Sequence, residues 1–247
     1  MKILGLIPSR MESKRLPAKS LLPISGLPLV IHTYRRANLS KLLHKTLICT
    51  DSKKIIQTAK KFKSKAILTS PYHKNGTERI AEALIKEKTK YDLIVDIQGD
   101  EPLISPYHID EVIKFHKKNL DADIILPTLK INFPDNPNLI KVVTNKKNEV
   151  LYLSRNKIPF EAKSKSSSFL KHLSIISFKP EALIKFSRSN QTPLEKIEDI
   201  ELLRALEIGL KIKTIKLKGD SFSVDVKEDY KRAKDRMNKD KFFRLYK

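Results

Sequence analysis

The first half of the chain alternates short apolar runs with longer amphipathic stretches, which limits the possible folds more than any other feature. Short apolar runs are typical of buried strands, and the longer stretches have the spacing of helices that connect parallel strands. We predict strands at residues 3–8, 46–50, 66–69 and 93–98. We predict helices at residues 29–37, 53–62 and 78–88. Together these elements indicate an α/β fold built on a doubly wound, Rossmann-like mixed sheet.

The second half has a different pattern, in which strands outnumber helices. We predict strands at residues 124–131, 141–144, 150–153, 173–178 and 213–217, and helices at 180–186, 195–208 and the charged C-terminus. The stretch "NKKNE" is predicted to form a hairpin turn, and "SKSSS" a mobile loop. We expect a single domain, with a core at 1–120 and about 210–247 and a smaller β-rich part at about 121–209.

The chain is strongly basic, since 50 Lys and Arg against 28 Asp and Glu give a formal net charge of +22. A nucleic-acid-binding protein usually gathers such charge on one face or tail and adds aromatic side chains for stacking. Here the lysines are spread in short runs such as "KKFKSK", there is no Trp, and aromatic residues make up 7%. We therefore expect solvated lysines and no nucleic-acid partner, with a nonenzymatic nucleic-acid binder as the alternative.

The single cysteine, Cys49, excludes an intramolecular disulfide and is expected to be a buried strand thiol in a reducing compartment. No apolar run reaches the ~18 residues that span a bilayer. The apolar part of "MKILGLIPSR" is also too short for a secretory signal. We expect a cytoplasmic protein with no membrane insertion.

The first predicted strand is followed by "SRMESKRLPAK", a loop with four cationic side chains. Ligands of doubly wound sheets bind beyond the carboxyl ends of the strands, so this position favours an anion site. The loop has no glycine and matches no Walker A sequence, so phosphate contacts must come from side chains. Arg10, Arg15 and Lys19 are the candidates, because guanidinium forks and a compact ammonium suit phosphate oxygens. Lys14 is expected to be solvated, and a solvated basic loop without a ligand is the alternative.

Two acidic residues far apart in the chain each follow an apolar run, Asp100 in "DIQGDEP" and Asp225 in "SVDVKEDY". Mg²⁺ in nucleotide sites commonly takes one or two protein carboxylates and completes its shell with phosphate oxygens and water. Asp100 and Asp225 fit such a pair, although a strand-ending turn also accounts for Asp100. Asp96 is expected to be structural, and Asp229 is expected in the first turn of the last helix, where negative charge is favourable.

None of the six histidines forms a metal-binding spacing with another His or with Cys, and no G-x-S-x-G motif is present. His172 begins a predicted strand, where it either points into a site or is structural. The sequence therefore gives little support for a hydrolase.

Taken in order, the motifs resemble those of the 3-deoxy-manno-octulosonate (KDO) cytidylyltransferases. The matching blocks are "IPSRMESKRLPAKSLLPISGLPLV", "TDS", "NGTERI", "VDIQGDEPLI", "KVVTN", "LYLSRNKIPF", "KHLSI", "TPLEKIEDIELLRALEIG" and "VDVKEDY". They lie between residue 7 and about residue 230. The combination of RLPxK, GTER, QGDEP and YxSRxxIP is far more specific than any one of these fragments.

The resemblance implies a magnesium-dependent nucleotidyltransferase that transfers CMP from CTP to the anomeric hydroxyl of KDO, for lipopolysaccharide synthesis, and releases pyrophosphate. It implies that Lys19, Asp100 and Asp225 are catalytic and that the two carboxylates bind the metal. The implied nucleotide-binding residues are Arg10, Arg15, Lys19, Thr77, Arg79 and Gln98. The implied sugar-binding residues are Gln98, Arg155, His172, Glu195 and Glu198. It also implies a homodimer paired through the β-rich part.

The sequence departs from the family pattern at several positions. Ala18 stands where glycine is usual, Ile176 and Ser177 where a Tyr-Gly pair is common, Leu202 where the family has Gln, and Val226 with Lys227 where it has Thr-Pro. Three of these six positions, Ile176, Ser177 and Leu202, fall in the sugar-binding part, so KDO, 8-amino-KDO and a sialic-acid-like sugar are all open as acceptors. A paralogue that binds CTP but has weakened activity is a further alternative.

Overall fold

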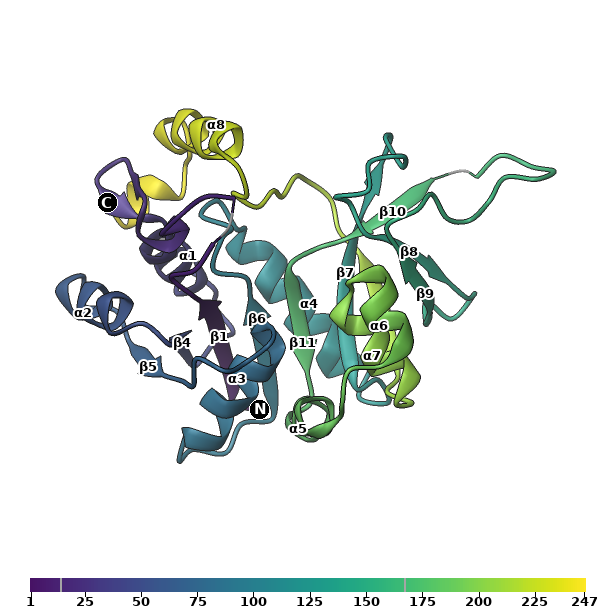
Figure 1. The fold of residues 1–247 in the computed structure, drawn as a ribbon, viewed down its shortest axis with the longest axis horizontal. Coiled ribbons are helices and arrows are strands. Elements are labelled where there is room, and N and C mark those ends of the chain that lie inside the picture. The colour runs from purple at the N-terminus through teal and green to yellow at the C-terminus, as the bar shows by residue number, and fades with distance from the viewer. Residues whose placement is uncertain (14, 167) are drawn as a thin grey trace. The chain divides into compact units, whose positions relative to one another are not determined.

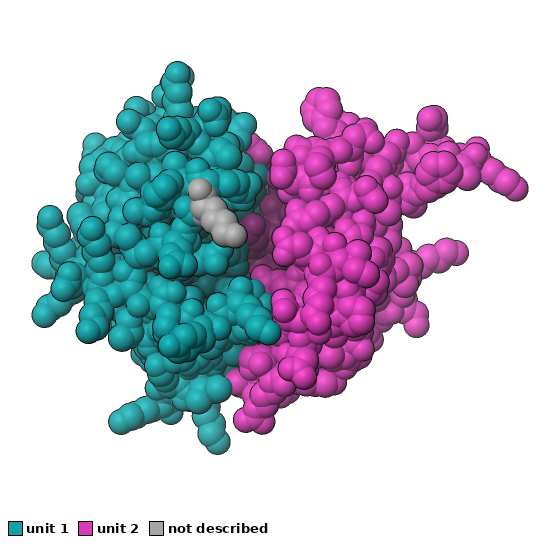
Figure 2. Space-filling model, in the orientation of Figure 1, with its two compact units in different colours: residues 1–111, 221–247 teal, residues 112–220 magenta. Residues whose placement is uncertain are grey.

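The computed structural model describes residues 1–13, 15–166 and 168–247, so the predictions for Lys14 and for part of the "SKSSS" loop lie outside the described residues. The chain divides into two compact units, which Figure 2 shows in separate colours. Unit 1 comprises residues 1–111 and 221–247, and unit 2 comprises residues 112–220. The C-terminal segment therefore belongs to the same unit as the N-terminal half. The functions predicted for the two parts of the chain stay predictions.

Unit 1 is built on parallel strands in the order β5-β4-β1-β6 (Figure 1). The strands are β1 (Ile3–Ser9), β4 (Lys45–Thr50), β5 (Ala66–Leu68) and β6 (Leu93–Ile97). The connecting helices are α1 (Leu29–Ala37), α2 (Lys53–Lys61) and α3 (Gly76–Lys86). Each of these elements lies within two residues of its predicted bounds, and the predicted doubly wound α/β fold is confirmed.

Local sequence explains where several of these elements begin. The side chain of Ser52 accepts a hydrogen bond from the Ile55 N–H and caps α2, and the side chain of Asn75 caps α3 in the same way through Glu78. All seven residues of β1 are buried, as expected for a strand between two parallel neighbours. Cys49 is fully buried in β4, as predicted, and burial raises the pKa of its thiol.

The strand order of unit 1 reverses beside β1. The chain runs from β1 to β4 and β5 on one side, and β6 then pairs with the other side of β1. In such sheets the carboxyl ends of the strands at the reversal form the ligand site. The segments after β1 and β6, which carry "SRMESKRLPAK" and "QGDEP", therefore lie at the expected place.

The remaining elements of unit 1 were not all predicted. They are η1 (Lys19–Leu21), β2 (Pro23–Ile24), β3 (Leu27–Pro28), α8 (Lys227–Asn238) and η2 (Phe243–Leu245). Helix α4 (Pro106–Lys118), which spans the boundary between the units, was also missed. None of the helices in the part of the chain that the structure describes is long and apolar enough to cross a membrane.

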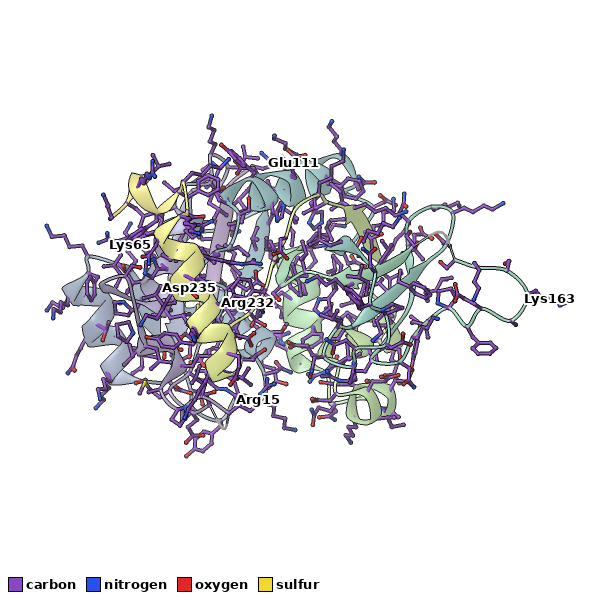
Figure 3. The ribbon with its side chains drawn as sticks, turned by 90° about the horizontal axis from the view of Figure 1, so that it is seen from above. Arg15, Lys65, Glu111, Lys163, Arg232 and Asp235 are labelled. Carbon is purple, nitrogen blue, oxygen red and sulfur yellow. The ribbon has the colours of Figure 1, made fainter. Side chains whose placement is uncertain are left out.

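Unit 2 is organised around β7 (Ile124–Ile131). This strand pairs in antiparallel fashion with β10 (Phe169–His172) and β11 (Ile175–Phe178), and in parallel with β12 (Ile212–Lys216). The hairpin of β8 (Lys141–Thr144) and β9 (Val150–Ser154) extends the sheet beyond β10. The helices are α5 (Pro180–Arg188), α6 (Pro193–Glu198) and α7 (Glu201–Glu207). Part of the chain that follows β9 extends away from the rest of unit 2, with Lys163 near its tip (Figures 1 and 3).

Two predictions for unit 2 were wrong. The strand expected at 173–178 begins two residues later, as β11, and the preceding strand β10 was missed. The single helix expected at 195–208 is broken into α6 and α7 at Asp199, whose backbone is left-handed with φ 52° and ψ 48°. Asp tolerates this conformation better than most residues, and it ends a helix without a glycine. The predicted hairpin turn is confirmed by the Asn145 N–H, which donates to the Glu149 carbonyl at 2.9 Å.

Candidate active site

The loop after β1 is anchored at both of its ends. The Ser9 hydroxyl donates to Ser20 Oγ at 2.7 Å, and Ser20 in turn donates to the Arg10 carbonyl at 3.1 Å. Leu16, in the middle of the loop, is buried in an apolar cluster that includes residues of α1 and α8. This cluster consists of Leu16, Ile24, Leu29, Val224, Ala233 and Met237. The basic loop is therefore a packed part of unit 1 and not only a solvated turn.

Ala18 sets the position of Lys19. Its backbone is left-handed, with φ 52° and ψ 29°, directly before η1 begins at Lys19. The Lys19 N–H donates to the Leu16 carbonyl at 3.2 Å and closes this tight turn. Glycine adopts the left-handed region freely, which is the physical reason for the family's usual glycine at this position.

Lys19 lies between the two remote carboxylates that the sequence singled out. Its Nζ is 2.8 Å from Asp100 Oδ2 and 3.1 Å from Asp225 Oδ1. The Lys19 side chain is 16% exposed, against 26% for Asp100 and 33% for Asp225. The Val224 N–H donates to the Asp100 carbonyl at 2.9 Å, so a backbone hydrogen bond also joins the two acidic segments. The structure thus brings together the three residues predicted to be catalytic.

Asp225 has further partners that fix its carboxylate and its backbone. Ser223 Oγ donates to Asp225 Oδ2 at 2.9 Å, and Arg15 forms an ion pair with Oδ1 at 3.2 Å. The Asp229 carboxylate accepts the Asp225 and Val226 N–H groups at 3.2 and 3.3 Å. Asp229 lies in the first turn of α8, as predicted, and holds Asp225 immediately before that helix.

The charges of this cluster stabilise one another. Burial by itself lowers the pKa of Lys19, but Asp100 and Asp225 raise it more, so the net pKa lies above its usual value. Burial raises the pKa of Asp225, but Lys19, Ser223 and Arg15 lower it more, so its net pKa lies below the usual value. Lys19 and Asp225 are therefore both charged at neutral pH.

The other predicted nucleotide-binding residues do not all join this cluster. Arg79 is 4% exposed, and its guanidinium donates to Asp51 at 2.7 Å and to Thr69 Oγ1 at 2.7 Å. Thr77 lies in the first turn of α3, where its buried hydroxyl has no hydrogen-bond partner among the described residues. Gln98 follows β6 and donates to Asp96 Oδ2 at 2.8 Å. Arg10 is exposed at the end of β1.

The segment "QGDEP" depends on a close approach of two backbones. A Cβ at Gly99 would lie 2.5 Å from the Pro8 carbonyl oxygen, a distance that real Cβ atoms essentially never show. Gly99 therefore allows the end of β6 to pack against the end of β1. This contact places Asp100 beside the loop that carries Lys19.

In unit 2, two of the predicted sugar-binding residues contact each other. The Arg155 N–H donates to Glu198 Oε2 at 3.0 Å, and Arg155 Nε donates to the Glu198 carbonyl at 2.8 Å. Ser154 Oγ donates to the other carboxylate oxygen of Glu198 at 2.7 Å. Arg155 also reaches Asp199, so it ties the end of β9 to the break between α6 and α7.

The remaining two predicted sugar-binding residues lie apart from that pair in their contacts. Glu195 is 4% exposed, and both of its carboxylate oxygens accept from the Arg204 guanidinium, at 2.7 and 2.6 Å. His172 ends β10 opposite Thr128, and burial lowers the pKa of His172 to about 4. The structure thus gives Glu195 a structural partner, and its predicted contact with a sugar stays a prediction.

Several supporting residues were missed by the sequence reasoning. They are Lys141, Arg204 and Ser223. Two of these residues had a signal in the sequence. Arg204 lies within the apolar stretch "ELLRALE", and Lys141 precedes the apolar pair "VV". A charged residue in such a place is expected to be buried and to need a partner. Ser223 gave no signal that separates it from other serines.

Comparison with known proteins identifies the family of this chain. The family profile described as cytidylyltransferase matches residues 4–212. The 3-deoxy-manno-octulosonate cytidylyltransferase of Fusobacterium nucleatum subsp. nucleatum is 40% identical over 234 residues, which cover 93% of this chain and 94% of that protein. The chain belongs to the 3-deoxy-manno-octulosonate cytidylyltransferase family. It is therefore a nucleotidyltransferase.

Two further relatives of this cytidylyltransferase bear on its substrates. The solved structure of CMP-2-keto-3-deoxy-manno-octonic acid synthetase in complex with CTP aligns with a TM-score of 0.92 at 29% identity, covering 97% of this chain and 99% of that one. The 8-amino-3,8-dideoxy-manno-octulosonate cytidylyltransferase of Shewanella baltica is 35% identical over 243 residues, covering 96% of this chain and 99% of that protein.

Proposed function

We propose that this chain transfers CMP from CTP to the anomeric hydroxyl of KDO, with release of pyrophosphate. The observation that carries the proposal is the cluster of Lys19, Asp100 and Asp225, beyond the carboxyl ends of β1 and β6. One ammonium and two carboxylates suit the binding of a triphosphate together with a divalent cation. The relatives named for KDO transfer and the solved CTP complex support the two substrates.

The donor set of the cluster fits Mg²⁺. The oxygens of Asp100 and Asp225 already converge on one cationic group, at 2.8 and 3.1 Å. Within residues 1–13, 15–166 and 168–247, no three or more His, Cys, Asp and Glu side chains form a group that could hold a metal. Phosphate oxygens and water must therefore supply the other ligands. Mg²⁺ bound there would neutralise phosphate charge and lower the pKa of the attacking sugar hydroxyl.

The chain's own residues contribute mainly positioning and charge. In-line attack of the sugar hydroxyl on the α-phosphate develops negative charge on the phosphate oxygens, and Lys19 is placed to stabilise it. Arg10 and Arg15, on the same loop, bind the outer phosphates. No side-chain general base is required, because a hydroxyl with a lowered pKa would release its proton to solvent water.

Further residues bind the rest of the two substrates in this proposal. Around the nucleotide these are Thr77, Arg79 and Gln98, and Gln98 also contacts the sugar. In unit 2 the sugar-binding residues are Arg155, His172, Glu195 and Glu198. The support for these roles is the family resemblance of the motifs that contain them.

The acceptor KDO has one specific competitor. The Shewanella baltica relative is named for 8-amino-3,8-dideoxy-manno-octulosonate, and it matches this chain over nearly its whole length. We therefore keep the 8-amino sugar as the second candidate acceptor. The two sugars differ at carbon 8 alone, so a direct comparison of kcat/KM separates them.

Pyrophosphate release from CTP and Mg²⁺ against a panel of acidic sugars tests the proposal. We expect turnover with an eight-carbon ulosonic acid, and a loss of at least about 10²-fold in Asp100→Asn and Asp225→Asn. The matched control is Asp235→Asn, an exposed aspartate on α8 (Figure 3), which should keep the wild-type rate. Full activity in either site variant contradicts the metal assignment, and turnover with none of the sugars contradicts the function.

We also propose a homodimer in the cytoplasm. The dimer is supported by the family resemblance, and the location by the single buried thiol of Cys49, which suits a reducing compartment. Light scattering coupled to gel filtration tests the dimer against the chain mass of 28.4 kDa. A single peak at the mass of one chain, at micromolar concentration, contradicts it.

A further inference from the structure

Lys19 lies where the two proposed metal ligands converge. Its ammonium contacts Asp100 Oδ2 and Asp225 Oδ1 at the same time, at 2.8 and 3.1 Å, and the side chain is only 16% exposed. Arg15 also forms an ion pair with Asp225, at 3.2 Å, whereas Lys19 bridges both carboxylates. The Lys19 ammonium is therefore a cation of the chain itself that lies between the two carboxylates.

From this geometry we infer that Lys19 occupies the cation position between Asp100 and Asp225 until CTP binds, so that divalent-cation binding at this pair depends on the nucleotide. The inference rests on the proposed function for the identity of the metal ligands. It adds a role for Lys19 before the reaction, as a placeholder for the metal ion.

The physical basis is competition for the same oxygens. Mg²⁺ binds carboxylate oxygens at about 2.0–2.1 Å, so an ion bound to both carboxylates would lie within a few ångströms of the ammonium. Two cations that close repel strongly in a partly buried site. The Lys19 ammonium must leave before the ion can take both carboxylates.

The triphosphate removes this obstacle in two ways. It supplies the additional oxygens that two carboxylates cannot provide to an ion that prefers six ligands. It also offers the displaced ammonium new anionic partners, so that Lys19 moves from the carboxylates to the phosphates. Nucleotide and metal then favour each other's binding by the same factor, as thermodynamic linkage requires.

The loop is built so that the side chain can move while the backbone stays in place. The contacts of Ser20 with Ser9 and Arg10, together with the turn hydrogen bond from Lys19 to Leu16, hold the backbone on both sides. The ammonium is attached through four methylene groups, whose rotations allow a shift of several ångströms. The transfer therefore needs no rearrangement of the fold.

The test measures Mn²⁺ binding to the nucleotide-free full chain by electron paramagnetic resonance, in wild type, Lys19→Met and Arg15→Met. Arg15→Met is the matched control, because it removes one positive charge that contacts the same Asp225 oxygen. We expect Lys19→Met to bind Mn²⁺ at least about tenfold more tightly than wild type, and Arg15→Met to gain less than about threefold. Adding Asp100→Asn to Lys19→Met should abolish the gain.

The outcomes distinguish this inference from the proposed function. Equal gains in Lys19→Met and Arg15→Met, or no gain in either, overturn the placeholder role. If Lys19→Met still binds Mn²⁺ more tightly than wild type after Asp100→Asn is added, the ion binds elsewhere. That result overturns the metal assignment of the proposed function as well. Thermal melts show whether each variant folds. If Lys19→Met does not fold, Lys19→Gln takes its place in the comparison. Pyrophosphate release with KDO, measured on wild type, tests the reaction independently of these binding data.

Discussion

Ala18 is a single residue in an unfavourable backbone conformation next to the proposed catalytic lysine. A non-glycine residue in the left-handed region loses about 1 kcal/mol or more relative to glycine. We expect Ala18→Gly to raise the free energy of unfolding by about 0.5 kcal/mol, because relief of strain exceeds the entropy that glycine gains in the unfolded chain. Urea denaturation measures the difference. Ala59→Gly, in the interior of α2, is the control and should lower the free energy of unfolding. A lower free energy of unfolding in both variants contradicts the strain at Ala18.

His32 is a buried residue that links stability to pH. It is fully buried, its Nε2 lies 2.7 Å from the Ile24 carbonyl, and burial lowers the pKa of His32 to about 4. Because this pKa lies below the unfolded value of 6.5, the unfolded chain binds the proton first as pH falls. Stability contributed by neutral His32 is complete above pH 6.5 and is lost between pH 6.5 and about 4, by about 3 kcal/mol at most.

The variant His32→Gln tests this linkage. It has no group to titrate at this position, so its loss of stability between pH 7 and pH 4.5 should be smaller than that of wild type by about 2 kcal/mol. Urea denaturation at the two pH values gives the difference. His116 and His172, whose pKa values burial also lowers to about 4, remain in both proteins and cancel in the comparison. An identical pH dependence in the variant contradicts the assignment to His32.

At the scale of elements, the contact between the ends of β1 and β6 decides where Asp100 lies. Gly99→Ala would put a methyl group 2.5 Å from the Pro8 carbonyl oxygen, so the end of β6 must move away from β1. We expect a loss of about 1–3 kcal/mol in stability, and a fall of at least about tenfold in pyrophosphate release as Asp100 moves. Gly76→Ala is the milder control, because its Cβ meets a proline ring carbon at 3.2 Å. Wild-type activity and stability in Gly99→Ala contradict the close-approach argument.

Lys141 connects two segments of unit 2 through a buried ammonium. Lys141 is fully buried. Its Nζ donates to the Asn136 carbonyl at 2.9 Å and also to the Arg155 carbonyl. Lys141→Met keeps most of the side-chain volume and leaves both carbonyls without this donor. We expect a loss of about 2–3 kcal/mol in the free energy of unfolding. Lys171→Met, on the neighbouring strand β10 and half-buried, should change stability less, and an equal effect of both contradicts a specific role for Lys141.

The bounds of the parallel strands in unit 1 and of the helices α1 to α3 that connect them were predictable, because buried parallel strands give short apolar runs that are hard to mistake. In unit 2 the same reasoning failed at two places. The apolar run "LSIISF" begins in the break between β10 and β11, two residues before β11 starts. The amphipathic run from Glu195 to Ile208 continues past the left-handed Asp199. Hydrophobic periodicity indicates which residues are buried, but it does not indicate where the backbone changes direction.

At the scale of the whole molecule, the net charge of +22 predicts a general attraction to polyanions. We expect weak binding to duplex DNA at about 50 mM salt that disappears at about 200 mM, because counterion release dominates such binding. Pyrophosphate release at the higher salt should persist, since the Lys19 contacts are partly buried and less screened. Fluorescence anisotropy with labelled DNA measures the first effect. DNA binding that resists the higher salt contradicts a purely nonspecific attraction and favours the nucleic-acid-binding alternative.

By itself the sequence determined the doubly wound α/β fold and the choice of Lys19, Asp100 and Asp225, because strand periodicity and the residues that follow strand ends are local properties. Only the tertiary structure decided how these residues meet. Lys19 pairs with carboxylates 81 and 206 positions away in the chain. Arg79 forms an ion pair with Asp51, and Glu195 forms one with Arg204. Such pairings depend on packing between distant segments, which no local spacing records.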